Sequence, residues 1–283
     1  MDPRPSHDLI FAGGGVMPLG ARTRVMGVLN VTPDSFANGG RHLELPRALE
    51  AAARMVEAGA DIIDVGGESS RPGSEPVDAA LEADRVLPVI EELARRHDVR
   101  ISIDTTKASV ARQALDAGAD MINDITALGD PRMLPLARDR RVPIALMHMR
   151  GEPSTMQRDT AYEDLIGTIV DFLRRRVELA AGAGVEDGKI LVDPGIGFGK
   201  SVAGNLSILK DLPTLARVGR PILLGASRKT FIGKTLSLPV EERLEGSLAV
   251  AAYASARGAH VIRAHDVLAT VRVVRMVDAI REV

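Results

Sequence analysis

The sequence predicts one closed barrel of eight parallel β-strands, each followed by an α-helix, with a short N-terminal hairpin that caps its bottom. Eight short β-rich runs recur along the chain, and each is followed by a polar, Gly-rich stretch and a segment of helical period. The runs are apolar nearly throughout, which is typical of a parallel sheet covered on both faces. Eight such units fit a (β/α)₈ barrel, or TIM barrel, better than an open doubly wound sheet.

A repeated junction supports the same fold. The segments EAGADIIDVG from Glu57, DAGADMINDI from Asp116 and ARGAHVIRAH from Ala256 share one order: a helix end, Gly, Ala, a polar residue and an apolar strand. In the first unit the helical run RALEAAARMVEAG places apolar residues on one face and ends at Gly59, a helix C-cap signal. The repeated feature is therefore a helix-to-strand turn.

The expected strands follow one another with room for a helix and two turns. In chain order they are VMGVLN from Val25, DIIDV from Asp61, RISID from Arg100, DMIND from Asp120, PIALM from Pro143, KILVD from Lys189, PILLG from Pro221 and HVIRA from His260. We expect residues 1–24 to form the hairpin, because GGG and PLG lie there between short apolar runs. Residues 25–283 are expected to form the barrel domain.

Composition narrows the function classes. Among the 283 residues, 45% are apolar and 26% are charged, and a net charge of −2 gives no electrostatic drive toward nucleic acid. The chain contains no Cys, which excludes disulfides, thiolate metal sites and a cysteine nucleophile. No apolar run approaches the roughly 18 residues of a membrane span, and the acidic start does not suit a signal peptide. We therefore expect a cytoplasmic protein without a membrane partner.

Polar residues end every expected strand, and in a parallel barrel the reactive groups gather at these carboxyl ends. Any one of them could be only a helix cap or a turn former, but polar residues at all eight ends are harder to explain in that way. The residues are Asn30, Asp64 with Glu68, Asp104, Asn123 with Asp124, His148, Asp193, Ser227 with Arg228 and Lys229, and Arg263 with His265.

Two short motifs resemble the end of a nucleotide-binding loop, GKS at 199–201 and GKT at 233–235. That loop requires a Gly five positions before its second Gly, where this chain has Pro194 and Arg228, so both matches fail. The carboxyl ends of the expected strands, which form the mouth of the barrel, instead combine carboxylates and amides with the cations of Arg and Lys. Buried acceptors suit an amino-substituted heterocycle, because an unpaired polar group in a dry pocket costs about 1–3 kcal/mol. Cations beside an amide oxygen that can bind Mg²⁺ suit a phosphate or pyrophosphate leaving group.

Eight motifs in this order resemble those of the dihydropteroate synthases, from about Val25 to the C-terminus. They are NVTPDSF from Asn30, GGESSRPG from Gly66, SIDTTK from Ser102, INDI from Ile122, LMHMRG from Leu146, DPGIGFGK from Asp193, GASRK from Gly225 and RAHDV from Arg263. The resemblance implies a cytoplasmic (β/α)₈ enzyme of folate synthesis that joins a dihydropterin pyrophosphate to p-aminobenzoate and releases pyrophosphate. It also implies Mg²⁺ as cofactor, sensitivity to sulfonamides and a homodimer paired through the last helices.

The resemblance also implies roles for individual residues. The pterin would be bound by Asp104, Asn123, Met147, Asp193, Phe198, Gly225, Lys229 and Arg263. The pyrophosphate would be bound by Asn30, Ser70, Arg71, Arg263 and His265, with Asn30 as the Mg²⁺ ligand. The p-aminobenzoate would be bound by Phe36, Pro72, Lys229 and Ser227, the last at a helix start. The catalytic groups would be Asp104, Asp193, Lys229, Arg263 and His265.

One departure from the family pattern lies in the first loop, which reads SFANGG where the family usually has SFSDGG. Asn38 therefore replaces a frequent carboxylate, and turnover is expected to be lower if that carboxylate assists the amine. Two other function classes stay open. One is a binding module, either a methyl-pterin carrier or a silent paralogue, and the other is an aldolase-type barrel with Lys229 as Schiff base.

Overall fold

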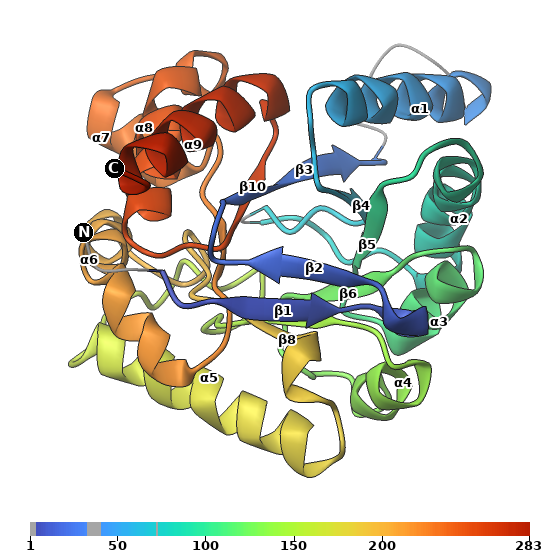
Figure 1. Ribbon diagram of the computed structural model, residues 1–283, viewed down its shortest axis with the longest axis horizontal. Coiled ribbons are helices and arrows are strands. Elements are labelled where there is room, and N and C mark those ends of the chain that lie inside the picture. The colour runs from blue at the N-terminus through green and yellow to red at the C-terminus, as the bar shows by residue number, and fades with distance from the viewer. Residues whose placement is uncertain (1–3, 33–40, 72) are drawn as a thin grey trace.

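The computed structural model describes residues 4–32, 41–71 and 73–283, and it has the predicted barrel (Figure 1). All eight expected strands are present, and each begins within two residues of its predicted start. The strands are β3 (Arg24–Asn30), β4 (Ile62–Gly66), β5 (Arg100–Asp104), β6 (Met121–Asp124), β7 (Ile144–Met147), β8 (Ile190–Asp193), β9 (Leu223–Gly225) and β10 (Val261–Ala264). They form one parallel sheet in the order β8-β7-β6-β5-β4-β3-β10-β9.

The sheet closes weakly between β8 and β9. A single parallel bridge pairs Val192 with Ile222, and the backbone N–H of Val192 donates to the carbonyl of Pro221 at 3.0 Å. Pro221 itself has no N–H to contribute to the ladder. The eight strands therefore form a barrel in which a single β-bridge joins β8 to the segment that leads into β9.

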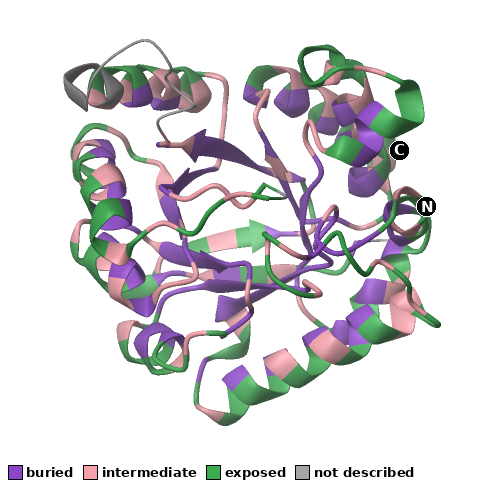
Figure 2. Ribbon diagram, turned by 180° about the vertical axis from the view of Figure 1, so that it is seen from behind, coloured by how far each residue is buried: buried purple, intermediate pink, exposed green. Residues whose placement is uncertain are grey.

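Helices surround the sheet, as Figure 2 shows, with their buried residues toward the strands and their exposed residues outward. The α-helices are α1 (Arg41–Glu57), α2 (Ala79–Arg96), α3 (Ala108–Asp116), α4 (Met133–Arg140), α5 (Leu165–Gly182), α6 (Val202–Lys210), α7 (Thr230–Leu236), α8 (Leu244–Ala256) and α9 (Val267–Arg281). The 3₁₀ segments are η1 (Ala12–Gly14), η3 (Asp187–Lys189), η4 (Leu212–Val218) and η5 (Val240–Glu242). Between sheet and helices lies a continuous apolar core, made mainly of Val, Ile, Leu and Ala. Within the described ranges, no helix combines the length and apolar character that a membrane crossing needs.

The expected N-terminal hairpin is present and covers the bottom of the barrel (Figure 1). Strands β1 (His7–Ile10) and β2 (Val16–Leu19) pair antiparallel. Their Leu9 and Leu19, together with Phe11 in the turn, are fully buried against the first residues of the barrel strands, among them Ile62 and Val261. The guanidinium of Arg100 lies 4.5 Å from the centre of the Phe11 ring. The hairpin thus replaces the water that would otherwise fill the open amino end of the barrel.

We predict that Phe11→Ala destabilises the protein by about 3–5 kcal/mol, because it leaves a cavity under the barrel floor. Val16→Ala, in the same hairpin but 54% exposed, is the matched control and should change the free energy of unfolding by about 0.5 kcal/mol or less. Urea unfolding at equilibrium measures both. Equal effects of the two variants would show that the hairpin is not part of the core.

Candidate active site

Two of the predicted site residues flank a small space at the mouth of the barrel. Asn30 ends β3 and Asp104 ends β5, and Gly66 at the end of β4 pairs with both of them. A Cβ on Gly66 would lie 3.8 Å from Asn30 Oδ1 and 3.7 Å from Asp104 Oδ2. The missing side chain at Gly66 therefore leaves space between an amide oxygen and a carboxylate from the two strands that flank β4.

Arg263 on β10 connects the carboxylates at the centre of the site. Its Nε donates to Asp64 Oδ2 at 2.6 Å, and its Nη2 donates to Asp104 Oδ2 at 2.6 Å. Burial lowers the pKa of Arg263, but the attraction of Asp64 and Asp104 outweighs burial, so the pKa lies above its ordinary value. Burial raises the pKa of Asp104, and Arg263 offsets only part of that rise. The guanidinium is thus a permanent cation that holds one fully buried acid and one half-buried acid in place.

Asp64 is a site residue to which the sequence analysis assigned no role. It lies within β4 and is completely buried, and its Oδ2 accepts hydrogen bonds both from Arg263 and from Asn123 Nδ2, the latter at 3.0 Å. Its other oxygen, Oδ1, has no hydrogen-bond partner among the described residues. The signal in the sequence was an Asp inside an otherwise apolar buried strand, where an acid needs a specific partner.

A second acid and cation lie near one another at the mouth: the buried Asp193 ends β8, and the half-buried Lys229 lies in the loop after β9. Burial lowers the pKa of Lys229 to about 8, and the nearby Asp193 carboxylate opposes that change. Burial likewise raises the pKa of Asp193, which Lys229 opposes. The ammonium of Lys229 lies 4.4 Å from the ring centre of Phe198 and donates to the carbonyl of Ile196. An acid, a cation and an aromatic face therefore meet in one place.

The loop after β8 can form this shape only with glycine. Gly195 has a φ of +69°, and a Cβ there would lie 2.0 Å from the carbonyl oxygen of His148. Its N–H donates to Asp193 Oδ1 at 2.7 Å. The Gly-rich run that fails as a nucleotide loop thus serves to bring backbone close to β7 and to orient Asp193.

His265 lies at the edge of this group. Burial lowers its pKa to about 4, with further lowering by the cations of Arg263 and Arg228, so its imidazole is neutral near pH 7. The hydroxyl of Ser227 lies 3.1 Å from His265 Nδ1 and accepts from the backbone N–H of His265 at 3.2 Å. Because the hydroxyl oxygen accepts from this N–H, its hydrogen can go to Nδ1, which leaves a hydrogen on Nε2.

The expectation that Ser227 stands at a helix start was wrong. Helix α7 begins at Thr230, with Lys229 as its N-cap. Arg228 has a φ of +58°, which a right-handed helix cannot contain, so Ser227 is separated from the helix. Its hydroxyl is oriented by His265 rather than by a helix end.

The remaining predicted residues are distributed around the mouth. Met147 packs with Phe198 in a small apolar cluster, and Gly225 leaves room beside the side chain of Arg263. Ser70 and Arg71 lie in the loop after β4, and the charge of Arg71 contributes to the low pKa of His265. Phe36, Asn38 and Pro72 lie outside the described residues.

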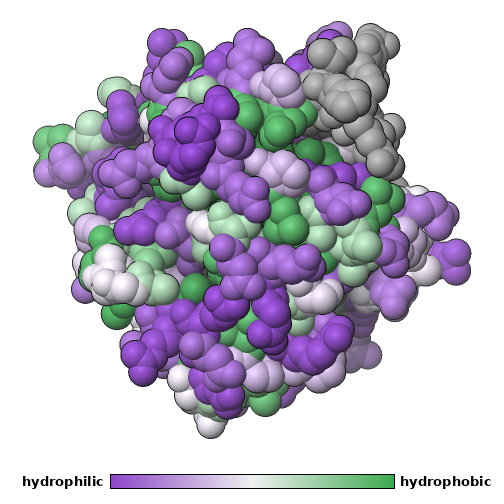
Figure 3. Space-filling model, turned by 90° about the vertical axis from the view of Figure 1, so that its right-hand side faces the viewer, coloured by the Kyte–Doolittle hydropathy of each residue, from purple (hydrophilic) through white to green (hydrophobic). Residues whose placement is uncertain are grey.

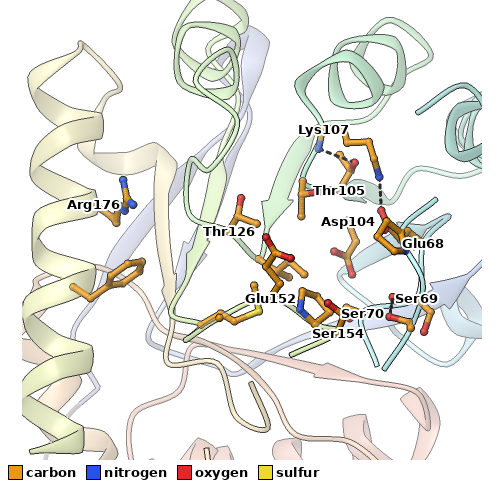
Figure 4. Close-up of a pocket in the computed structure, with 18 residues that line it drawn as sticks. Glu68, Ser69, Ser70, Asp104, Thr105, Lys107, Thr126, Glu152, Ser154 and Arg176 are labelled. Carbon is orange, nitrogen blue, oxygen red and sulfur yellow. Dashed lines mark hydrogen bonds and ion pairs between the residues drawn. The ribbon is translucent and has the colours of Figure 1, made fainter. Parts of the chain in front are cut away.

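A cavity of about 470 Å³ adjoins the predicted site and, among the described residues, shares only Asp104 and Ser70 with it (Figure 4). Hydroxyl side chains such as Thr105 and Thr126 and the apolar Met149 and Phe172 line it. Lys107 on its wall pairs with Glu68, from the loop after β4, and with the buried Glu82 on α2. The cavity lies toward β5, β6 and α5, away from Lys229 and His265, so it extends the mouth to one side.

Lys200 is a second buried residue that the sequence analysis did not assign. Its ammonium donates to the carbonyls of Phe198 at 2.8 Å and His148 at 3.1 Å. Burial lowers its pKa to about 7, although Asp193 opposes the change. Burial also lowers the pKa of His148 to about 3, so its imidazole is neutral near pH 7. Lys200 thus ties the loops after β7 and β8 together behind the site.

The donor set fits a magnesium ion that arrives with a substrate phosphate. Across the described part of the chain, no cluster of three or more His, Asp or Glu side chains is arranged to hold a metal on its own. Asn30 offers one neutral amide oxygen at the mouth, next to Asp104. Mg²⁺ commonly retains several waters and takes one or two protein oxygens plus phosphate oxygens, which matches a single amide ligand.

Comparison with known proteins places this geometry in a family. The family model described as pterin binding enzyme matches residues 26–265. A dihydropteroate synthase from Synechocystis sp. is 49% identical to this chain over 263 residues, which cover 92% of this chain and 91% of that protein.

Two solved structures have the same fold at similar identity. A Yersinia pestis dihydropteroate synthase in complex with a sulfonamide drug superposes with a TM-score of 0.91 at 46% identity, covering 96% of this chain and 98% of that one. A Xanthomonas albilineans dihydropteroate synthase with 4-aminobenzoic acid superposes with a TM-score of 0.92 at 42% identity, covering 99% of this chain and 100% of that one.

The buried Lys200 makes stability depend on pH. Its pKa in the fold, about 7, is below the roughly 10.4 of an unfolded lysine, so the unfolded chain binds more protons between these values. Stability therefore rises with pH through this window. We predict that Lys200→Met removes roughly 1–2 kcal/mol of the gain between pH 7 and pH 9.

Urea unfolding of both proteins at the two pH values measures this difference. Lys210→Met, which removes an exposed lysine, is the matched control and should keep the wild-type pH dependence. An unchanged pH dependence in Lys200→Met would contradict the inferred desolvation of Lys200.

Proposed function

The chain belongs to the pterin-binding enzymes, among the dihydropteroate synthases of folate biosynthesis, and we propose how its residues divide that reaction among them. The enzyme joins a dihydropterin pyrophosphate to p-aminobenzoate, giving 7,8-dihydropteroate and pyrophosphate. One observation carries the proposed division of roles: Asp104, Asn123 and Asp193 meet the cations of Arg263 and Lys229 at one end of the barrel.

The pterin ring is proposed to bind between two groups of charged side chains. One group is Arg263 with Asp64 and Asp104, and the other is Asp193 with Lys229. Asn123 and Asp193 supply acceptors for its amino and ring N–H groups, and Lys229 donates to its ring acceptors. Met147 and Phe198 provide the apolar contact for a flat ring. The buried environment excludes water, so each correctly placed hydrogen bond discriminates strongly between ligands.

The diphosphate is proposed to bind on the side of His265 and Arg71. The neutral His265 donates through Nε2, and Ser70 and Arg71 contribute from the loop after β4. Asn30 would hold Mg²⁺, which when bound neutralises part of the diphosphate charge. Arg263 lies between ring and diphosphate, because its guanidinium extends from β10 toward Asp104 at the mouth.

The chemistry needs no covalent enzyme intermediate. The C–O bond to pyrophosphate breaks, the amine nitrogen of p-aminobenzoate forms the new C–N bond, and the amine loses one proton. The cations of Arg263 and Arg71 stabilise the departing pyrophosphate, and Asp104 and Asp193 stabilise positive charge that develops on the pterin. We place the carboxylate of p-aminobenzoate near Ser227, with Phe36 and Pro72 as further contacts.

The alternatives raised by the sequence are less well supported. Both the relative and the two structures described above are dihydropteroate synthases, not methyl-pterin carriers or aldolases. The reaction is proposed to occur in the cytoplasm, because a substrate with a diphosphate group does not cross a membrane unaided.

A homodimer is proposed to form through α7, α8 and α9. Large apolar side chains are exposed on these helices, including Leu236, Tyr253, Leu268, Met276 and Ile280. By contrast, the face that carries α1 to α4 is mainly hydrophilic, with smaller hydrophobic areas (Figure 3). Exposed apolar residues gathered on one face are typical of an association surface.

We predict that the wild-type protein releases pyrophosphate only with both substrates and Mg²⁺, and that sulfonamides inhibit it by competing with p-aminobenzoate. Lys229→Ala should lose pterin affinity and most activity, because it removes the one cationic donor proposed for the ring acceptors. A coupled assay of pyrophosphate release measures both. Undiminished activity of Lys229→Ala would remove Lys229 from the proposed pterin site, and no pyrophosphate from the wild type would overturn the proposed reaction.

We predict that Met276→Glu shifts the protein from dimer to monomer, because it places a charge in the proposed interface. Leu179→Glu is the matched control, since Leu179 is similarly exposed but lies on α5. Sedimentation velocity over a range of protein concentrations distinguishes the two states. A wild-type monomer, or equal behaviour of both variants, would contradict an interface on α9.

A further inference from the structure

One carboxylate oxygen of Asp64 contacts two residues of the site. Asp64 Oδ2 accepts from Arg263 Nε at 2.6 Å and from Asn123 Nδ2 at 3.0 Å. Asp64 is completely buried on β4, and it contacts the ligand-facing residues from below rather than from the mouth. An ionised carboxylate only accepts hydrogen bonds, so the group of Asn123 that faces it must be a donor.

The orientation of the Asn123 amide follows from this contact. Its nitrogen must point toward Asp64, because the amide oxygen would meet a carboxylate oxygen without a hydrogen between them. The amide oxygen and the second amide hydrogen then remain for a ligand. Asn123 is 4% exposed and lies one residue before the end of β6, in register with Asp104 and Ala145. Because Asp64 holds one amide hydrogen from below, we take the remaining edge to face the mouth as one acceptor beside one donor.

We propose that Asp64 is a positioning residue that determines specificity for a 2-amino pterin, by holding the Asn123 amide in one orientation. The inference rests on the proposed function, in which Asn123 binds the pterin. A 2-amino-4-oxo pteridine presents a ring nitrogen lone pair beside an exocyclic N–H, which is complementary to the donor and acceptor of this edge. A 2,4-dioxo pteridine presents the reverse, a ring N–H beside a carbonyl oxygen, and is mispaired.

Two substitutions at Asp64 separate the acceptor from the charge. Asp64→Leu keeps the branched shape but offers no acceptor, so the Asn123 amide can turn and pair with either ligand. Asp64→Asn loses the charge but can still place its amide oxygen toward Arg263 and Asn123, because both of these neighbours donate. The measured quantity is the ratio of the dissociation constants of the 2,4-dioxo and 2-amino pteridines, determined by calorimetry.

The expected ratio favours the 2-amino ligand in the wild type. It should fall by about ten- to a hundredfold in Asp64→Leu and stay within a few fold of the wild type in Asp64→Asn. Asp278→Leu is the matched control, because Asp278 is a buried ion-pair partner of Arg4 near the bottom of the barrel. That variant should keep the wild-type ratio. Thermal melting of every variant establishes that it is folded at the assay temperature.

Two results would overturn the inference. One is a folded Asp64→Leu that keeps the wild-type ratio, and the other is an Asp64→Asn that loses the ratio as fully as Asp64→Leu. If Asp64→Leu does not fold, Asp64→Ala replaces it, because Ala also removes the acceptor. The same fall in the ratio of dissociation constants is then expected, and an unchanged ratio would overturn the inference. A wild type that binds neither pteridine would instead overturn the proposed function, so the two failures are distinguishable.

Discussion

The ion pairs of the Arg263 guanidinium with Asp64 and Asp104 are the interaction on which the site depends. The guanidinium reaches Asp64 and Asp104, which come from two neighbouring strands and would repel one another without a cation between them. Removing one partner of a buried charge pair leaves the other uncompensated, at a cost of about 3–5 kcal/mol. The charges at the site are poorly solvated. A ligand with N–H donors and a negative tail can therefore gain favourable interactions with both the acids and the cation. Binding and structure use the same charges.

The barrel separates this polar group from the residues that stabilise the fold. At the amino end, the hairpin and the first strand residues form a dry apolar plug, next to a buried cluster in which Asp278 accepts from Arg4 and Thr23. At the carboxyl end, short Gly-rich loops bring backbone and charges together. A stable bottom allows the top to carry several desolvated charges, which are unfavourable for folding but useful for recognition.

The sequence predicted the fold well because each strand carries its own local signal. Apolar runs and polar strand ends located β3 to β10 to within two residues, and the motifs placed the predicted site residues at one end. Three features were not predicted. The helix expected at Ser227 begins at Thr230, because Arg228 adopts a left-handed backbone conformation. Asp64 and Lys200 gain their roles only from residues distant in the sequence, since Asp64 meets Arg263 past the intervening strand β3 and Lys200 meets the carbonyl of His148.

The central claim is that the ring of the product lies between the Arg263 ion pairs and the Asp193 and Lys229 side chains, and a crystal structure of this protein with 7,8-dihydropteroate tests it most directly. The account predicts the pterin ring against Asn123 and Asp193, with Lys229 at its opposite edge. A ring bound instead in the adjoining cavity, beside Thr126 and Arg176, would contradict the account.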